Sequence, residues 1–294
     1  MKTHFFCLKA ILVTVTLAFV ACDNKNWKPD VYVAVTERND EGNRVATLWK
    51  NGTPQRLSDG KGDAFALSVF VVGVDVYAAG YEYNAEENRV ATLWKKGTPQ
   101  RLSDGKGSAS ANSVFVAGEE VYVAGYERNA EGNSVATLWK NGMPQRLSDG
   151  KSHAVANSVF VVGEDVYVAG HEWNTGGNSV ATLWKKGTPQ RLSDGKGDAS
   201  ANAVFVVGED VYAAGYEYNT EEDCVATLWK NGTPQRLSDG KSSAWARSVF
   251  VVGKDVYVAG GARDNAAIWE NGFSKSYGFS KSLGTGSATS VFVK

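Results

Sequence analysis

Short apolar segments separated by glycine-containing turns follow one another along most of the chain. In residues 113–157, SVFVAGEEVYVAGYERNAEGNSVATLWKNGMPQRLSDGKSHAVAN, the apolar runs are rich in β-branched and aromatic residues and show no helical period. This pattern predicts four strands, at 113–117, 121–127, 134–140 and 144–148. The chain is therefore expected to be all-β.

The connections within one such unit favour tight antiparallel hairpins. Asn-Gly or Lys-Gly stands between the third and fourth strands, as in Asn51-Gly52 and Asn141-Gly142. These residues tolerate the positive φ angles of a two-residue hairpin turn. A VGED segment or a close variant makes a second tight turn between the first and second strands.

The same unit recurs with a fixed period. Five tryptophans, each in the segment ATLWK, are spaced 45 residues apart, and a degenerate sixth copy follows after 40: Trp49, Trp94, Trp139, Trp184, Trp229 and Trp269. Four antiparallel strands in about 45 residues is typical of a β-propeller blade. The sequence predicts a six-bladed β-propeller of four-stranded blades over residues 30–294, with repeats that start near 30, 68, 113, 158, 203 and 248.

The first copy begins at Asp30 and lacks the SVFV strand that opens the others. Residues 290–294, SVFVK, match this strand. We expect them to complete the first blade and close the ring, which would leave no exposed sheet edge. A linear solenoid is the alternative, but neither end resembles a polar capping repeat.

The N-terminal segment has the layout of a secretory signal. Lys2 and Lys9 precede an apolar run over residues 10–21, which is shorter than the roughly 20 residues that span a bilayer. The run ends at Cys22, and FVAC resembles the lipobox of bacterial lipoproteins. The resemblance implies a signal peptide at 1–21, a lipidated Cys22 with a short linker to 29, and an extracytoplasmic protein held to a bacterial membrane by lipid alone. An ordinary secretory signal with an incidental cysteine is the alternative.

Charge and cysteine content exclude some classes of function. Removal of the signal leaves 29 basic and 32 acidic residues, so no basic face for nucleic acid is expected. Cys22 and Cys224 would remain, and a lipidated Cys22 would leave Cys224 without a partner, so no disulfide framework is expected. We expect a monomer without metal or cofactor.

The tandem VYVAGYE, ATLWKNG and LSDG segments resemble bacterial extracytoplasmic β-propeller lipoproteins built from the same units. The resemblance covers residues 30–294 and implies a fold, not an activity. WD-repeat and Kelch signatures are absent, and LSDGKGD does not match the Asp-box of sialidases. No catalytic residues are carried over, and function has to be argued from sites.

Differences between the nearly identical copies fall at two places. One follows the second strand, at Arg38, Tyr83, Arg128, Trp173 and Tyr218, and the other lies in the link to the next blade, at Phe65, Ser110, Val155, Ser200 and Trp245. Both connections emerge at one end of an up-and-down blade, so we expect one variable face opposite a face of constant hairpins. Arg, Tyr and Trp often dominate binding interfaces. Ligand-binding candidates are Arg38, Tyr83, Arg128, Trp173, Tyr218, Phe65, Trp245 and His171.

Residues two apart in a strand share a side, which pairs His171 with Trp173 and Tyr216 with Tyr218. The alternative is that these side chains pack between blades, or that exposed positions drifted after duplication.

Other chemistry-bearing residues have simpler interpretations. The two histidines of the mature chain, His153 and His171, show no metal-ligand spacing, and as lone polar residues they are expected to be simply solvated. The five aspartates of LSDG precede glycine and favour a turn. The glutamates at 37, 82, 127, 172 and 217 could ring the variable face, although local hydrogen bonds at strand ends are expected. Cys224 reads as a surface substitution, not a nucleophile.

Three functions follow in order of preference. The first is a lipid-anchored module that binds a carbohydrate, peptide or protein on the variable face. The second is a structural or assembly subunit of the cell envelope. An enzyme such as a glycosidase or lyase comes last, because few residues occur only once around the ring and no catalytic group of unlike residues is visible.

Overall fold

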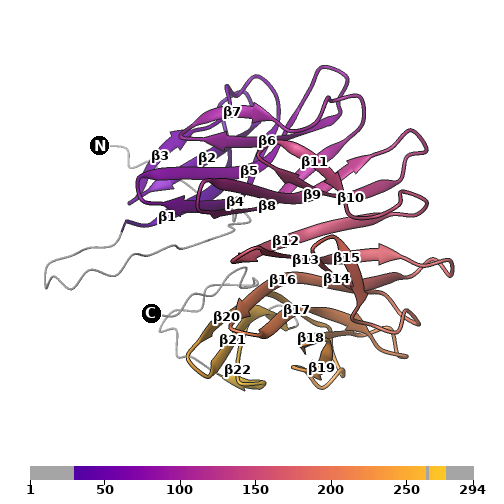
Figure 1. Ribbon diagram of the computed structural model, residues 1–294. Coiled ribbons are helices and arrows are strands. Elements are labelled where there is room, and N and C mark those ends of the chain that lie inside the picture. The colour runs from indigo at the N-terminus through magenta and orange to yellow at the C-terminus, as the bar shows by residue number, and fades with distance from the viewer. Residues whose placement is uncertain (1–29, 263–264, 276–294) are drawn as a thin grey trace, which may run out of the picture.

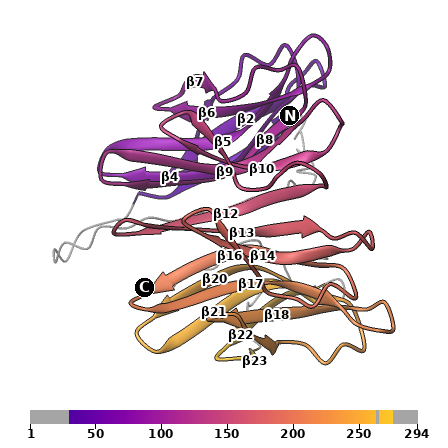
Figure 2. The same ribbon diagram turned by 45° about the vertical axis from the view of Figure 1, so that its right-hand side comes forward.

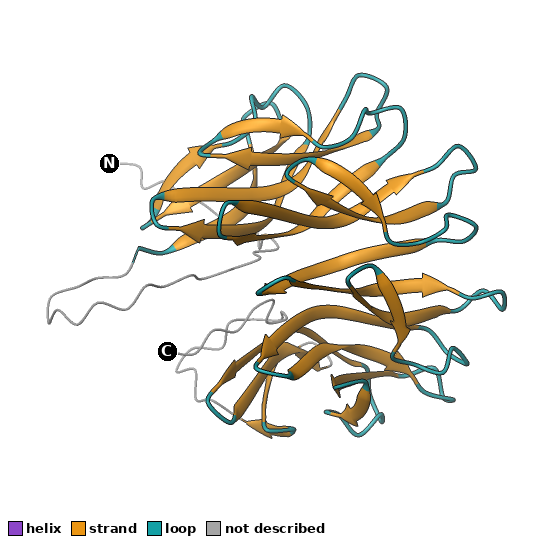
Figure 3. Ribbon diagram, viewed as in Figure 1, coloured by secondary structure: helices purple, strands orange, loops and turns teal. Residues whose placement is uncertain are grey.

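The computed structural model describes residues 30–262 and 265–275, which form 23 strands (Figure 3). The expected signal peptide at 1–21, the lipidation site Cys22 with its linker to 29, and the closing strand at 290–294 lie outside the described residues. Their assignments stay predictions.

The strands form six antiparallel sheets that follow one another in chain order (Figure 1). Blade one comprises β1 (Tyr32–Arg38), β2 (Arg44–Lys50) and β3 (Thr53–Arg56). Blade two comprises β4 (Ala64–Val72), β5 (Asp75–Tyr83), β6 (Arg89–Lys95) and β7 (Thr98–Arg101). Blade three comprises β8 (Ala109–Ala117), β9 (Glu120–Arg128), β10 (Ser134–Lys140) and β11 (Met143–Arg146).

The remaining three blades repeat the four-stranded order. Blade four comprises β12 (Ala154–Val162), β13 (Asp165–Trp173), β14 (Ser179–Lys185) and β15 (Thr188–Arg191). Blade five comprises β16 (Ala199–Val207), β17 (Asp210–Tyr218), β18 (Cys224–Lys230) and β19 (Thr233–Arg236). Blade six comprises β20 (Ala244–Val252), β21 (Asp255–Ala262), β22 (Asn265–Glu270) and β23 (Phe273–Lys275). The predicted all-β fold of six repeated blades is confirmed, whereas closure of the ring stays a prediction.

The hairpin between the third and fourth strands is a two-residue turn, as the sequence predicts. Asn51 and Gly52 have φ angles of 50° and 80°, and Lys96 and Gly97 have φ angles of 52° and 81°. Positive φ at both positions is the type I′ geometry that suits a hairpin. The asparagine adds a contact, since Asn231 Oδ1 accepts a hydrogen bond from the Val211 amide at 2.8 Å.

The first strand of each complete blade starts four residues before the predicted SVFV segment. In blade two, β4 begins at Ala64, and its pairing with β5 shifts register between Ala66 and Ser68. Leu67 is therefore the extra residue of a β-bulge. Bulges at Asn112, Asn157, Asn202 and Arg247 occupy the same position in the next four blades.

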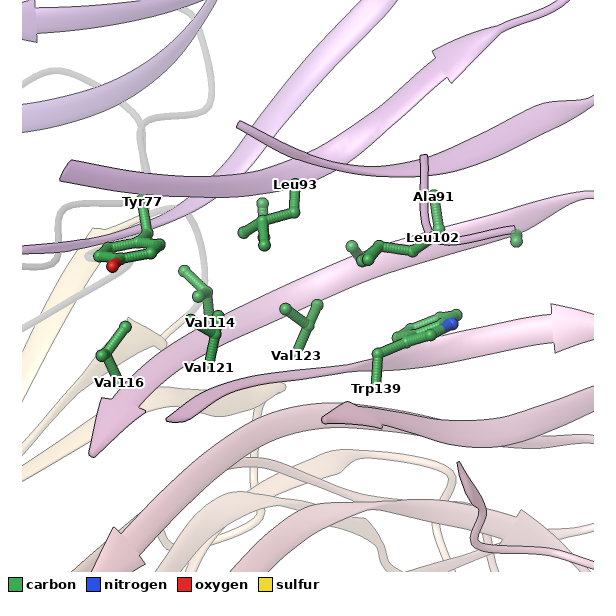
Figure 4. Close-up of a cluster of buried hydrophobic side chains, with 12 residues drawn as sticks. Tyr77, Ala91, Leu93, Leu102, Val114, Val116, Val121, Val123 and Trp139 are labelled. Atoms are coloured by element: carbon green, nitrogen blue, oxygen red, sulfur yellow. The ribbon is translucent and has the colours of Figure 1, made fainter. Parts of the chain in front are cut away.

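Neighbouring blades pack face to face (Figure 2). Small and branched side chains make up most of each junction. Between blades two and three, Tyr77 and Leu93 of one sheet meet Val114, Val123 and other residues of the next (Figure 4). Trp139 belongs to the same layer and is fully buried. Trp94, Trp184, Trp229 and Trp269 are likewise buried in the other junctions, whereas Trp49 of blade one is partly buried. Burial of side chains this large supplies much of the hydrophobic stabilisation.

A chain of phenylalanines links the first strands of successive blades. The ring centroids of Phe70 and Phe115 are 4.7 Å apart, and those of Phe205 and Phe250 are 4.9 Å apart. Phe160 continues the series between them. The first strands therefore form the inner side of the array, and the fully exposed fourth strands, such as β7 and β15, form the outer side.

Candidate functional site

The variable face is defined here as the end of the blades that carries the connection from second to third strand and the link between blades. The cross-strand register places the two variable positions at this end, because Phe65 lies opposite Tyr81 and Tyr83 follows two residues later. Phe65, Ser110, Val155, Ser200 and Trp245 lie within the first strands, not in a link, since these strands begin before the bulge.

A repeated asparagine that the sequence analysis overlooked holds the loops of this face. The Asn84 side chain accepts a hydrogen bond from the Asn88 amide at 2.9 Å and donates one to the Gly105 carbonyl at 2.9 Å. Asn39, Asn129, Asn174 and Asn219 make equivalent bonds. Their strict recurrence after the variable position was the signal. The variable side chains thus project from a fixed backbone, which limits the conformational entropy lost on binding.

Blade two gathers four of its large side chains into one cluster. The rings of Phe65 and Tyr81 stack at 4.7 Å, and Tyr83 meets Tyr81 edge-on at 5.8 Å. The Arg89 guanidinium lies 4.9 Å from the Tyr81 ring centroid and donates hydrogen bonds to the hydroxyls of Tyr83 at 3.1 Å and Tyr126 at 3.3 Å. An arginine of the protein itself therefore fills the space between these tyrosines.

The candidates of blade four are held by other partners. Trp173 is 44% exposed and meets the ring of His153 at 5.2 Å. His171 contacts the Ser200 hydroxyl of the next blade at 3.2 Å, and burial lowers the pKa of His171 to about 4. His153 Nδ1 accepts a hydrogen bond from the Ser134 amide at 3.1 Å. The expectation of simply solvated histidines is wrong, because both rings bond to neighbouring strands.

The two candidate arginines stand apart from these clusters. Arg38 is exposed and donates from Nη1 to the Gly42 carbonyl of its own loop at 2.8 Å. Arg128 is likewise exposed at the end of β9. The structure brings neither side chain into contact with another candidate.

Blades five and six share a pocket of about 420 Å³ on the variable face. It is lined by Asn202, Tyr216, Tyr218, Ser243, Trp245 and Arg247. Cys224 also lines it, and this residue is only 6% exposed. The interpretation of Cys224 as a surface substitution is therefore wrong, because the residue is buried at the start of β18, opposite Tyr218 of β17. Burial raises the Cys224 pKa to about 12, which disfavours the reactive thiolate.

Two candidate residues thus meet in one pocket, Tyr218 and Trp245. Tyr216 and Tyr218 contact each other edge-on at 5.9 Å, like the tyrosine pair of blade two. The Arg247 guanidinium lies 5.9 Å from the Trp245 ring centroid. Burial raises the Tyr216 pKa, so its hydroxyl remains a hydrogen-bond donor at neutral pH.

The repeated acidic residues have separate roles. Asp104 Oδ1 accepts a hydrogen bond from the Lys106 amide at 3.0 Å, which confirms the turn-forming interpretation, and the other four LSDG aspartates do the same. Glu37 accepts from the Trp49 indole at 3.1 Å. Glu82 and Glu217 line polar clefts, and burial raises the pKa of both carboxyl groups. Within residues 30–262 and 265–275, no group of three or more His, Cys, Asp or Glu side chains could hold a metal ion.

Comparison with known proteins identifies the class of fold. No family model and no curated protein matches the chain. A crystal structure of the WD40 β-propeller domain of Doa1 matches 90% of this chain and 86% of its own, at 14% identity and a TM-score of 0.50. A Trypanosoma rangeli sialidase mutant with trans-sialidase activity matches at 11% identity and a TM-score of 0.48, and this chain spans 52% of it. The protein has a β-propeller fold built of repeated blades, and at these identities the likeness concerns the fold alone.

Proposed function

We propose that the protein is an extracytoplasmic binding module, tethered to a bacterial membrane through Cys22, that holds a carbohydrate, peptide or protein partner on the variable face of its propeller. One observation carries the proposal. Blades that are otherwise nearly identical differ in large aromatic side chains at one end, where Trp173 and Tyr218 are 44% and 42% exposed.

Exposed aromatic rings on a rigid frame suit recognition. Rings of this size contribute contact area with little loss of rotamer entropy, and their polar tips add direction. The opposite end carries repeated hairpins with surface ion pairs such as Lys230–Asp210 at 2.7 Å. Each of blades one to four has a comparable pair between a lysine and a carboxylate. The partner is therefore assigned to the variable face.

Membrane attachment rests on the apolar run that stops at Cys22. In the described part of the chain there is no helix with the length and hydropathy needed to cross a bilayer. Cys22→Ser should move the protein from the membrane fraction to the soluble fraction, because a short signal offers no second hold. Unchanged partitioning would contradict lipid attachment.

The binding proposal is tested with glycan arrays and with pull-down from envelope extract. The wild-type chain is compared with the double variant Trp173→Ala, Tyr218→Ala. Met143→Thr is the matched control, because Met143 is 67% exposed on an outer hairpin and threonine stands at this position in four other blades. Loss of a captured glycan or protein in the double variant, with retention in the control, supports the proposal. Equal capture by all three proteins moves the site elsewhere.

A further inference from the structure

The pocket between blades five and six is open, whereas the equivalent space in blade two is occupied by a side chain. Tyr216 and Tyr218 correspond to Tyr81 and Tyr83, three repeats earlier. In blade two, Arg89 occupies the space beside the tyrosines and reaches Tyr126 of the next blade. The equivalents of Arg89 and Tyr126 are Cys224 and Gly261. Because both replacements are small, the volume that a side chain fills in blade two stays open here.

Arg247 gives the open pocket its charge. It occupies the bulge position, where the three preceding blades have asparagine. Those asparagines bond across a blade junction, as when Asn202 Nδ2 donates to the Ala246 carbonyl at 2.8 Å. Among the described residues Arg247 makes no hydrogen bond or ion pair, and its contact is the Trp245 ring. Arg247 is exposed to solvent, and partial burial of its side chain lowers the pKa of the guanidinium, a shift that the nearby Tyr216 opposes.

The other residues that line the pocket are suited to a cyclic ligand with a negatively charged group. Among the residues that the structure describes, no acidic side chain lines the pocket. Donors are available from the tyrosine hydroxyls, Ser243 and Asn202, and the aromatic rings of Tyr216, Tyr218 and Trp245 offer flat surfaces. The Trp245 indole nitrogen is buried and has no hydrogen-bond partner in the described part of the chain. A pocket of about 420 Å³ lies within the range of small-molecule sites.

We infer that this pocket binds a six-membered ring bearing a carboxylate, with the carboxylate on Arg247 and the ring against Tyr216, Tyr218 and Trp245. Guanidinium and carboxylate form paired charge-assisted hydrogen bonds, and Arg247 has no carboxylate partner among the described residues. This inference rests on the proposed function, since it names the ligand chemistry of one site on the variable face. A sugar acid and an aromatic acid share this chemistry.

Titration of the purified full-length chain with small acids distinguishes a sugar acid from an aromatic acid as the ligand. Glucuronate is compared with glucose, and benzoate with benzyl alcohol, by calorimetry and by tryptophan fluorescence. An acid that binds at least about tenfold more tightly than its neutral counterpart supports the inference. Preference for glucuronate identifies a sugar acid, and preference for benzoate identifies an aromatic acid. Equal binding of acids and neutral compounds, or no binding of either acid, overturns it.

The repeats provide variants with built-in precedents. Arg247→Asn introduces the residue of blades three, four and five, and should weaken acid binding by about tenfold or more. Cys224→Arg introduces the residue of blade two and should block the pocket. Cys224→Ser, the residue of blades three and four, should bind as the wild type does. Acid binding unchanged in Arg247→Asn overturns the inference even if Cys224→Arg does not fold.

Failure of the inference and failure of the proposed function give different results. If a partner is lost in the double variant Trp173→Ala, Tyr218→Ala but retained in Arg247→Asn, the proposed binding module is supported. The proposed acidic ligand is then contradicted. Acid binding that depends on Arg247, without a partner from arrays or extract, supports the pocket chemistry and contradicts a macromolecular partner.

Discussion

The hydroxyl of Ser158 accepts a hydrogen bond from the amide of Val204 at 3.2 Å, across the junction between blades four and five. Ser68 and Ser113 make the same bond to Val114 and Val159. Each bond satisfies an amide on the edge of a first strand that its own sheet leaves unpaired. At the next junction the serine is replaced by Ala203, which has no hydroxyl to offer Val249.

This difference predicts opposite effects of two small substitutions. Ala203→Ser should raise the free energy of unfolding by about 1 kcal/mol, and Ser158→Ala should lower it by a similar amount. Urea titration followed by tryptophan fluorescence measures both. If Ala203→Ser does not stabilise the protein, the serine bonds contribute nothing to the blade junctions.

Gly125 cannot be replaced by a larger residue without strain, because β8 and β9 approach each other closely at this position. A Cβ at Gly125 would lie 1.8 Å from the Ser110 carbonyl oxygen and 3.0 Å from the Trp139 ring. Gly125→Ala should therefore cost about 2–3 kcal/mol or more, because the strand and the buried indole cannot both yield. Gly132→Ala is the comparison, since a Cβ there meets nothing within 4 Å and only its positive φ opposes the change. Equal unfolding midpoints for the two variants would contradict the steric account.

Ring closure is testable without altering chain length. Val291 corresponds to Val69 and Val114, which are 0% and 3% exposed in their blades. If residues 290–294 complete blade one, Val291→Asp buries an unpaired carboxylate and should destabilise the protein by roughly 3 kcal/mol or more. Lys294→Ser is the control, because the equivalent Val72 is exposed. A Val291→Asp protein that melts like the control would contradict closure by this segment.

Stability should depend on pH through His171. Its folded pKa of about 4 lies below the ordinary histidine value of 6.5, because burial disfavours the charged ring. As pH falls from 6.5 toward 4, the unfolded chain gains a proton that the folded protein does not, so stability is lost across that window. The facing charged groups, Asp198 and His153, act in opposite directions on this pKa.

His171→Tyr isolates that contribution, since Tyr81, Tyr126 and Tyr216 occupy the same position in other blades. The variant should lose less stability than the wild type between pH 6.5 and pH 4, as thermal melts at each pH would show. Carboxyl groups with raised pKa, such as Glu172, are common to both proteins and cancel in the comparison. Parallel curves would exclude His171 as the titrating group.

The repeat was sufficient to predict the blades, and it was insufficient for the site. Trp139 and the Asn141-Gly142 turn recur at a fixed spacing, so strand order and hairpin geometry follow from local sequence. The contact between Arg89 and Tyr126 joins different blades 37 residues apart. Such a contact depends on how two sheets pack, which no period reveals. The bulge was missed for a related reason, because one extra residue at Leu67 leaves the apolar pattern of β4 unchanged.

Arg89 fills the space between the tyrosines of the blade-two cluster. Arg89→Ser introduces the residue of blades three and four and removes the contacts to Tyr81, Tyr83 and Tyr126. Loss of two hydrogen bonds and a cation–π contact should lower the free energy of unfolding by about 1–3 kcal/mol. The vacated space keeps the shape of a guanidinium, so methylguanidinium at low concentration should raise the melting temperature of the variant. Methylammonium, which lacks the planar donors, is the matched control. If neither cation restores stability, or if both restore it equally, the cluster does not select a guanidinium. Arg89 then contributes by filling space alone.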